Sequence, residues 1–336
     1  MPSVRARQPT IADVAQEAGV SLPTVSRVLT GSTPVRPETR ERVELAMKRL
    51  HYRPNGAARA LVKGSQPIIG VIAPDTAAYA RAIMIASIEE RARASGHLVT
   101  VTIHNPLDSS GVSAAVEVLL AQPIVGVVVL DYNSYDTVQL RSQLGGIPIA
   151  TVTNGVDSDA DVAHAVIDDR AAARAVVRHL LRGGTRTVHY ISVPYWGERT
   201  HPRELGWRDA VSEAGIEAPP PVTASDWSLE SALRAGAELA ANPQVTAVFC
   251  PNDEIAFGVM RSMHDAGRRV PDDVSVAGID DHPLSRTYVP SLTTFRLDWR
   301  WAGRVAFELL MSSTDALQRS GKPDNGLIVR ESSLAT

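Results

Sequence analysis

The sequence predicts a small all-α head at the N-terminus, followed by an α/β body of two doubly wound parallel-sheet lobes. Near the N-terminus two short helical patterns flank a glycine, whereas from residue 66 onward apolar, β-branched runs alternate with amphipathic helical stretches. The net charge of the chain also changes sign at about this position. Residues 1–64 hold 11 Lys and Arg against five Asp and Glu, a net of +6, and because the whole chain carries −3, the remainder carries −9.

Residues 10–31 are predicted to form two short helices joined by a tight turn. Apolar residues recur at helical spacing in both segments: Ile11, Val14, Ala15 and Ala18 in the first, and Val25, Val28 and Leu29 in the second. Gly19 stands where the first helix must end, Ser21 is a good N-cap, and Pro23 falls in a first turn that tolerates its missing N–H. This is the pattern of a helix-turn-helix, whose second helix enters a DNA major groove.

The outward-facing residues of the second helix favour this interpretation over an ordinary helical hairpin in a core. They combine hydroxyl, guanidinium and aliphatic groups: Leu22, Thr24, Ser26 and Arg27. Hydroxyl groups can contact phosphates, and an arginine can donate to guanine. Together with the net charge of +6 over residues 1–64, this face predicts a head that binds nucleic acid.

A third helix is expected to open at Pro37 and to close the head near residue 51. A turn-rich break follows at residues 52–56, and residues 57–63 are too few to form a stable helix alone in water, although a partner could stabilise one. We therefore expect three parts: a head over 1–54, a hinge helix and linker over 55–65, and the body over 66–336.

The body alternates strand and helix patterns, which indicates βαβ units and parallel sheets covered on both faces. The predicted strands are residues 68–73, 98–103, 125–130, 148–152, 163–167, 188–192, 247–250 and 274–279. The predicted helices include residues 80–95, 112–121, 170–182, 202–214, 229–241 and 254–266. Eight strands with a change of pattern near residues 156–163 fit two successive doubly wound halves better than one closed barrel. Such sheets bind ligands at the carboxyl ends of their strands, often in a cleft between lobes.

Several classes of protein are disfavoured by what the sequence lacks. Cys250 is the single cysteine, so there is no internal disulfide framework, and a reducing cytoplasm is expected. No secretory leader and no apolar run long enough for a membrane span are visible. Nucleophile elbows, phosphate-binding loops, zinc-protease histidine pairs and dinucleotide fingerprints are all missing, so we expect neither an enzyme nor a cofactor. Residues 280–282, Asp-Asp-His, lack matching ligands elsewhere, so we expect no metal site.

The helix-turn-helix head, the Tyr-x-Pro-Asn sequence at 52–55 and the two-lobed α/β body together resemble the lactose-repressor (LacI/GalR) family of bacterial transcription regulators. The resemblance covers nearly the whole chain. Its motifs lie at residues 24–29, 52–55, 252–258, 269–276 and 290–294. The lobes of this family look like periplasmic sugar-binding proteins. The resemblance implies one lobe of about 67–165 plus 299–325 and another of about 166–298 plus 326–336.

The resemblance also implies how the head reads DNA. Leu22 and Pro23 occupy the two base-reading positions of the family, and Arg27 matches the arginine that reaches guanine. Because neither Leu22 nor Pro23 can hydrogen-bond through its side chain, we expect them to read bases by apolar contact. Leu61 matches the hinge leucine that wedges into the minor groove between two half-sites, which implies a homodimer on a pseudo-palindromic operator. The other implied DNA contacts are Thr10, Thr24, Ser26, Asn55, Ala58 and Arg59.

An effector site in the cleft is implied as well. Arg203 matches the effector-binding arginine of the family, and Asn252 and Asp280 each follow a predicted strand, so donors and acceptors for sugar hydroxyls would meet there. Trp227 and Trp299 match positions where the family places aromatic rings against the ligand, and a flat apolar ring suits the C–H face of a pyranose. The candidates in the first lobe are Ala78, Tyr79, Arg81, Asp131 and Asn154.

We therefore expect a cytoplasmic transcriptional repressor that releases its operator when a small sugar closes the two lobes. Within the family, the alternative is a member that uses a corepressor or a ligand other than a sugar. Outside it, a sugar-binding module without regulation would not need the basic head, and a sugar-acting enzyme would need an acid–base pair that no spacing identifies. The C-terminal residues carry no leucine heptads of the kind found in tetrameric relatives, so a dimer is expected.

Overall fold

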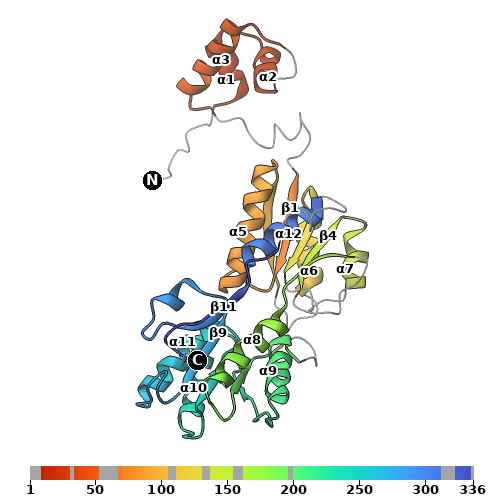
Figure 1. Cartoon of the computed structure of the whole chain (residues 1–336). Helices are drawn as coiled ribbons and strands as arrows, with labels where there is room; N and C mark the ends of the chain where they lie inside the picture. The colour runs from red at the N-terminus through yellow and green to blue at the C-terminus, as the bar shows by residue number, and fades with distance from the viewer. Residues whose placement is uncertain are drawn as a thin grey trace, which may run out of the picture. The chain divides into compact units, whose positions relative to one another are not determined.

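The computed structural model describes residues 9–30, 34–52, 67–104, 111–130, 137–153, 162–195, 200–311 and 322–333. Contacts between residues divide the chain into two compact units, Met1–Pro67 and Ile68–Thr336. Figure 1 shows the elements of both units, the small helical unit in red and the α/β unit from orange to blue. The predicted fold class, an all-α head and an α/β body with two sheets, is confirmed.

Three helices form the head: α1 (Ile11–Ala18), α2 (Leu22–Thr30) and α3 (Pro37–Arg49). Their apolar stripes meet in a small core made of Val14, Ala15, Ala18, Val25, Val28, Val43 and Ala46. Burial of this stripe supplies most of the stability of such short helices, because helices of eight or nine residues are marginal alone in water.

The ends of α1 are fixed by local hydrogen bonds. Thr10 and Asp13 form a capping box, in which the Asp13 amide donates to Thr10 Oγ1 (3.3 Å) and the Thr10 amide donates to Asp13 Oδ2 (2.7 Å). At the other end Gly19 adopts a left-handed conformation (φ 61°), which lets the chain reverse into α2. Arg42 of α3 donates to the Ala18 and Gly19 carbonyl oxygens (2.6 and 2.9 Å) and thereby ties α3 to this turn.

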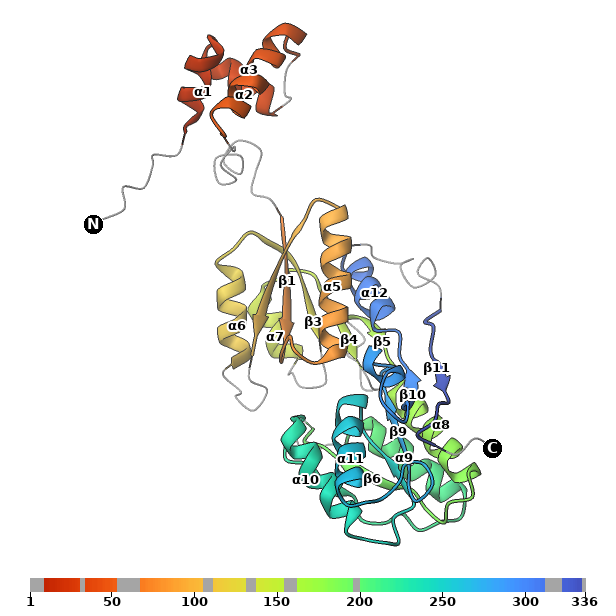
Figure 2. The same ribbon diagram turned by 90° about the vertical axis from the view of Figure 1, so that its left-hand side faces the viewer.

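The first sheet of the body contains five parallel strands in the order β2-β1-β3-β4-β5. They are β1 (Ile68–Ala73), β2 (Leu98–Ile103), β3 (Ile124–Leu130), β4 (Ile149–Thr153) and β5 (Ala163–Val166). Helices α5 (Tyr79–Ala94) and α12 (Trp299–Met311) pack on one face, whereas α6 (Gly111–Leu120) and α7 (Thr137–Leu144) pack on the other, as Figure 2 shows.

The second sheet has the strand order β11-β10-β9-β8-β6-β7. Its strands are β6 (His189–Ser192), β7 (Val222–Thr223), β8 (Ala247–Phe249), β9 (Ser275–Ile279), β10 (Thr293–Arg296) and β11 (Gly326–Ile328). Helices α8 (Asp169–Arg182) and α9 (Pro202–Glu213) cover one face, and α10 (Leu229–Ala240) and α11 (Asp253–Asp265) cover the other. A short 3-10 helix, η2 (Pro283–Arg286), follows β9.

Two features of this sheet differ from the sequence prediction. Strand β11 pairs antiparallel with β10, so the second sheet is not wholly parallel. Strands β7, β10 and β11 were also absent from the prediction. An apolar run does not mark them, because β7 has only two residues, β10 contains two threonines and an arginine, and β11 is a three-residue edge strand.

The chain crosses between the two sheets after β5, after β10 and again after α12. The second crossing brings α12 back onto α5 of the first lobe. A Cβ atom at Gly303 would lie 2.5 Å from the Met84 carbonyl oxygen, so only glycine allows the two helices to approach this closely.

Each sheet reverses its winding at one point. In the first sheet this point lies between β1 and β3, and in the second it lies between β6 and β8. Doubly wound sheets bind ligands at such points. Within the described ranges, no helix has the length and apolarity needed to cross a membrane.

Candidate functional sites in the cleft and on the head

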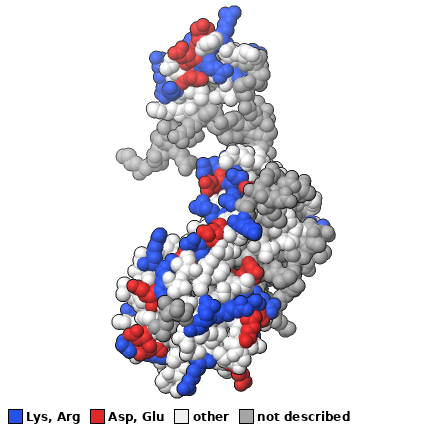
Figure 3. Space-filling view, in the orientation of Figure 1, with Lys and Arg blue, Asp and Glu red and all other residues white. Residues whose placement is uncertain are grey.

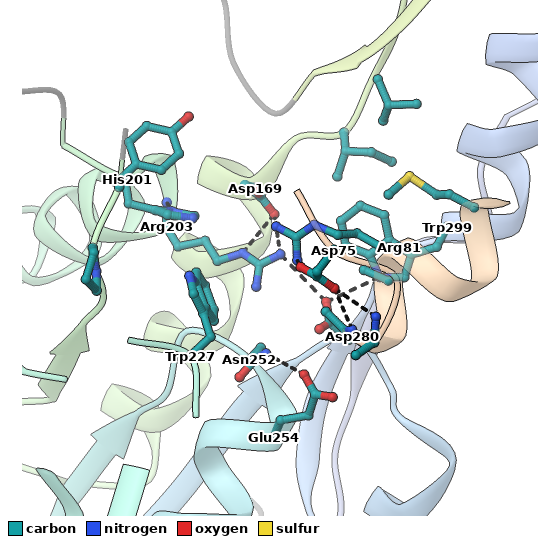
Figure 4. Close-up of a pocket in the computed structure, with 18 of the residues that line it drawn as sticks. Asp75, Arg81, Asp169, His201, Arg203, Trp227, Asn252, Glu254, Asp280 and Trp299 are labelled. Carbon is teal, nitrogen blue, oxygen red and sulfur yellow. Dashed lines mark hydrogen bonds and ion pairs between the residues drawn. The ribbon is translucent and has the colours of Figure 1, made fainter. Parts of the chain in front are cut away.

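A cavity of about 560 Å³ opens where the carboxyl ends of the two sheets face each other. Side chains that line it stand at or just after the ends of eight different strands: Asp75, Thr153, Asp169, Tyr195, Trp227, Asn252, Asp280 and Trp299. Figure 4 shows how six of them, Asp75, Asp169, Trp227, Asn252, Asp280 and Trp299, are arranged around the Arg203 side chain. The volume lies within the range of small-molecule pockets, and both lobes contribute to the wall.

Arg203 lies at the centre of the wall. It stands in the first turn of α9 and is almost fully buried. Its Nε donates to Asp169 Oδ1 (2.9 Å), its Nη1 donates to the Pro251 carbonyl oxygen, and its Nη2 lies 3.6 Å from Asp280 Oδ1. Burial by itself would lower the pKa of Arg203, but Asp169 and Asp280 outweigh that effect and raise it, so the guanidinium remains charged.

Asp280 has two neighbours in the wall, and both contact the same carboxylate oxygen. Its Oδ1 accepts a hydrogen bond from Trp299 Nε1 (3.2 Å) and lies 3.6 Å from Arg203 Nη2. Burial raises the pKa of Asp280 well above its usual range, and Arg203 opposes that rise. Asp280 and Asp281 both have positive φ angles (121° and 51°), which non-glycine residues rarely adopt, so the surrounding contacts must hold this loop.

Polar residues, some buried and some partly exposed, supply the supporting contacts around this loop. Asp281 pairs with Arg296 (3.0 Å) and Arg330 (2.5 Å). Asp253 accepts hydrogen bonds from the backbone of His282 (2.8 Å) and from the hydroxyls of Ser285 (2.7 Å) and Thr294 (2.6 Å). These interactions lie behind the wall and fix the carboxylate of Asp280 at the cavity.

Asn252 caps a helix and also lines the cavity. Its Oδ1 accepts from the Ile255 amide (2.9 Å) and caps the N-terminus of α11, while its Nδ2 donates to Glu254 (3.0 Å). An amide oxygen has two acceptor sites and an amide nitrogen has two hydrogens, so one of each stays available for a ligand.

A group of aromatic rings lines one side of the cavity. The His201 ring lies 4.6 Å from the Tyr195 ring and 6.1 Å from the Trp227 ring, measured between centroids. His201 Nδ1 accepts from the Arg203 amide (3.1 Å) and caps α9. Burial, with contributions from Arg203 and Arg81, holds the pKa of His201 well below its usual range. The ring is therefore neutral with its proton on Nε2, where it can donate to a ligand.

Seven of the residues predicted for the effector site line this cavity: Ala78, Arg81, Arg203, Trp227, Asn252, Asp280 and Trp299. Tyr79 does not belong to the wall. Its ring lies against His282 (4.7 Å between centroids), whereas Ala78 and Arg81 beside it do line the cavity. Asp131 and Asn154 fall outside the described residues.

Sequence reasoning missed seven charged or aromatic residues of the wall, namely Asp75, Asp169, Tyr195, His201, Glu254, Phe257 and Tyr288. Asp169 and His201 stand at helix N-termini that follow the predicted strands 163–167 and 188–192, and this position is the one indication that could have identified them. Among the described residues, no three His, Cys, Asp or Glu side chains gather in a way that could hold a metal ion.

The outer face of α2 is the second candidate site. Leu22 (47% exposed), Pro23 and Arg27 are exposed, and Thr24 and Ser26 are half-buried. Thr10, exposed at the start of α1, is engaged in its capping box. Figure 3 shows Lys and Arg side chains spread over the face of the head that this view presents. The hinge residues implied by the resemblance, Asn55, Ala58, Arg59 and Leu61, lie outside the described residues.

Comparison with known proteins places both units. Residues 10–55 match the family described as bacterial regulatory proteins, lacI family, and residues 177–333 match the periplasmic binding protein-like domain. The chain is 30% identical to the lactose operon repressor of Escherichia coli, over 97% of this chain and 91% of the repressor. It is 32% identical to the transcriptional repressor PurR of Haemophilus influenzae, over 90% of each protein.

Two solved structures extend the comparison. The lac repressor dimer bound to operator and the anti-inducer ONPF superposes with a TM-score of 0.81 at 28% identity, covering 98% of this chain and 100% of the other. The complex of the transcriptional regulator CelR with cellobiose superposes with a TM-score of 0.67 at 26% identity, covering 97% of this chain and 100% of that one.

Proposed function

Because this chain belongs to the lacI family of bacterial regulatory proteins and is a DNA-binding transcriptional repressor, we propose that a small sugar bound in the cleft controls its operator affinity. One observation carries the proposal: the guanidinium of Arg203, the amide of Asn252 and the carboxylate of Asp280 line one cavity with Trp227 and Trp299. Neighbouring sugar hydroxyls need donors and acceptors together, and the C–H face of a sugar ring needs a flat apolar surface. The related CelR structure holds cellobiose.

The outer face of α2 is proposed to read the operator. Arg27 is exposed and can donate two parallel hydrogen bonds to guanine, while Thr24 and Ser26 are suited to phosphates or base edges. Leu22 and Pro23 read by apolar contact, for example with a thymine methyl group. Leu61 is proposed to wedge into the minor groove at the centre of the site.

A second copy of the chain is the proposed partner of the first lobe. Strand β2 is the edge strand of its sheet, and apolar side chains stand exposed on β2 and on the neighbouring helix α6: Leu98, Val101, Ile103, Val118 and Leu120. An exposed apolar edge of this kind favours pairing with another surface. The related lac repressor structure is a dimer bound to operator.

The proposed mechanism couples two states of the dimer. In the absence of sugar, the two heads and hinges hold the two half-sites of the operator. A sugar that contacts both lobes favours their closed arrangement, which shifts the contacts between the first lobes and separates the hinges. Sugar and operator then oppose each other through one coupling free energy, typically about 1–3 kcal/mol.

Selection of genomic DNA by the purified full-length chain tests the DNA-binding part. We expect enrichment of a pseudo-palindromic sequence, and we expect Arg27→Ala to reduce it. Addition of candidate sugars to the selected complex then tests control. Release of DNA supports an inducing sugar, retention at higher affinity identifies a corepressor, and a response to purine bases with none to sugars contradicts the proposed ligand class.

A further inference from the structure

The cleft contains a second pair of charged side chains, in the first lobe. Asp75 follows β1, and its Oδ1 accepts from the amides of Ala77 (2.9 Å) and Ala78 (2.8 Å) at the start of α5. Its Oδ2 lies 3.1 Å from Arg81 Nη1. Both side chains line the cavity. The turn thus fixes the carboxylate, and the carboxylate orients the guanidinium toward the same space.

This pair is more accessible than the charged group around Arg203. The side chains of Arg81 and Asp75 are 20% and 40% exposed, whereas those of Arg203 and Asp280 are each 7% exposed. Arg203 is already surrounded by Asp169, Asp280 and the Pro251 carbonyl. Asp75 and Arg81, the first-lobe pair, therefore have more exposed side-chain surface for a ligand than Arg203 and Asp280 have.

Trp299 provides a second aromatic ring in the wall of the same cavity. It opens α12, the helix that packs on the first sheet, and its Nε1 is engaged by Asp280. What the indole still offers the cavity is its apolar face. In Figure 4, Asp75, Arg81 and Trp299 lie on one side of the Arg203 guanidinium and Trp227 lies on the other. Trp227 and Trp299 thus lie on different sides of the Arg203 guanidinium in the wall of one cavity.

The second-lobe set, defined as Arg203, His201, Asp280, Asn252 and Trp227, has enough donors, acceptors and ring surface to bind one sugar unit without Asp75 and Arg81. Arg203 and the Nε2–H of His201 are donors, Asp280 and Asn252 supply acceptors, and Trp227 supplies a ring. Among the described residues, none accepts from His201 Nε2, so that hydrogen is available for a ligand oxygen. The Asp75–Arg81 pair with Trp299 repeats the same combination of donor, acceptor and ring.

We propose that the effector is a saccharide of at least two sugar units, one held by Arg203, Asn252 and Trp227 and the other by Asp75, Arg81 and Trp299. This inference rests on the proposed sugar-responsive function and narrows it. An anionic group at the second position is disfavoured, because the Asp75 carboxylate already faces the Arg81 guanidinium and would repel it. Paired donors and acceptors fit neutral hydroxyls instead.

The arrangement has a consequence for lobe closure. A two-unit ligand contacts charged groups of both lobes at once, so it stabilises the closed arrangement. A single hexose contacts the second-lobe set and leaves Asp75 and Arg81 unengaged. It therefore binds more weakly and favours closure less.

Calorimetric titration of the full-length protein tests the inference. Cellobiose, lactose and maltose are compared with glucose and galactose on the wild type, Arg81→Leu and Asp75→Asn. Asn at position 75 retains the oxygen that accepts from the Ala77 and Ala78 amides, so the turn is preserved. Arg93→Leu is the matched control, because Arg93 lies on the same helix with its side chain 69% exposed and pairs with Glu89 (3.0 Å).

We expect at least one disaccharide to bind the wild type more tightly than either hexose by roughly tenfold or more. Arg81→Leu and Asp75→Asn should lower the affinity for that disaccharide by roughly 10- to 100-fold, as expected for lost hydrogen bonds to charged groups. Their affinity for the hexose should stay within about twofold, and Arg93→Leu should change neither. Thermal unfolding of each variant confirms that it is folded.

Three results overturn the inference. If hexoses bind as tightly as every disaccharide and Arg81→Leu alters neither, the site holds a single unit, although the sugar-responsive function still stands. If Arg81→Leu lowers the affinity for hexose and for disaccharide by the same factor, the site also holds a single unit. If neither size of saccharide binds the wild type, the proposed function fails and this inference fails with it.

Discussion

The outer face of α2 collects its side chains from residues 22–27, whereas the wall of the cleft draws on positions from Asp75 to Trp299. The α2 side chains are exposed or half-buried and contribute little to the core of the head. Those at the centre of the cleft, Arg203 and Asp280, are buried and form an ion pair (3.6 Å). At α2, therefore, binding and stability should separate, whereas in the cleft one substitution should alter both.

Arg203→Met gives the largest expected effect. It removes a buried cation and leaves the carboxylates of Asp169 and Asp280 without a counter-charge, so the body should lose about 3–5 kcal/mol of unfolding free energy. Sugar binding should fall below detection. Denaturant unfolding and calorimetry measure the two losses. Arg178→Met is the control, because the Arg178–Glu213 pair is exposed and should cost at most about 1 kcal/mol. An equal loss of unfolding free energy in Arg203→Met and Arg178→Met would contradict the assignment of Arg203 as the buried centre of the wall.

Arg27→Ala should show the opposite behaviour. It removes an exposed guanidinium from α2, so operator affinity should fall by about 1–3 kcal/mol while the unfolding free energy changes little. Anisotropy with labelled operator and denaturant unfolding measure the two quantities. Sugar affinity should remain that of the wild type. Loss of stability comparable to the loss of DNA affinity would remove the contrast between the two regions.

His201 adds a pH dependence to the cleft. Its pKa is lowered well below the usual value by burial, whereas in the unfolded chain it returns to about 6.5. The stabilising contribution of neutral His201 is therefore complete above about pH 6.5 and is lost as the pH falls, because only the unfolded chain takes up the proton. We expect wild-type unfolding free energy to decline relative to His201→Asn by about 1 kcal/mol per pH unit between about pH 6 and pH 5. Asn retains the N-cap of α9, so parallel pH profiles of the two proteins would count against a buried neutral histidine.

Tyr190 provides the smallest and most specific test. It is fully buried between the rings of Trp207 and Phe249 (5.3 Å to each), and its hydroxyl has no hydrogen-bond partner among the residues that the structure describes. Tyr190→Phe keeps the packing and removes an unsatisfied polar group, so the body should gain about 1 kcal/mol of unfolding free energy. Thr151→Val should act in the same direction, because the buried Thr151 hydroxyl also lacks a partner within the described part of the chain. Sugar affinity should not change in either variant, because neither residue lines the cavity.

The same contrast explains how much of the molecule could be predicted from sequence. Strands β1 and β2 begin and end at the predicted residues, because β1 is a continuous apolar run and β2 consists entirely of aliphatic and β-branched residues. The α2 face was also predictable, since helical periodicity alone determines which residues point outward. Asn252 and Asp280 were recognised because each directly follows a predicted strand.

The remaining wall residues depend on the tertiary structure. Asp75 and Asp169 belong to loop and helix-start positions where an acidic residue is common for local reasons, so no pattern distinguishes them. Successive residues on a helix point about 100° apart, and for this reason Arg81 faces the cavity whereas Tyr79 turns toward His282. That rotation about α5 is set by its packing against β1, β2 and α12, which the sequence of α5 alone does not contain.

A linkage measurement on the full-length protein tests the proposed control of DNA binding most directly. Operator affinity is measured with and without the saturating disaccharide identified by calorimetry, and disaccharide affinity is measured with and without saturating operator. Both affinities should fall by the same factor, roughly 5- to 150-fold, because one coupling free energy acts in both directions. Operator affinity that stays constant, or rises, while the sugar is demonstrably bound would contradict an inducing sugar in the cleft.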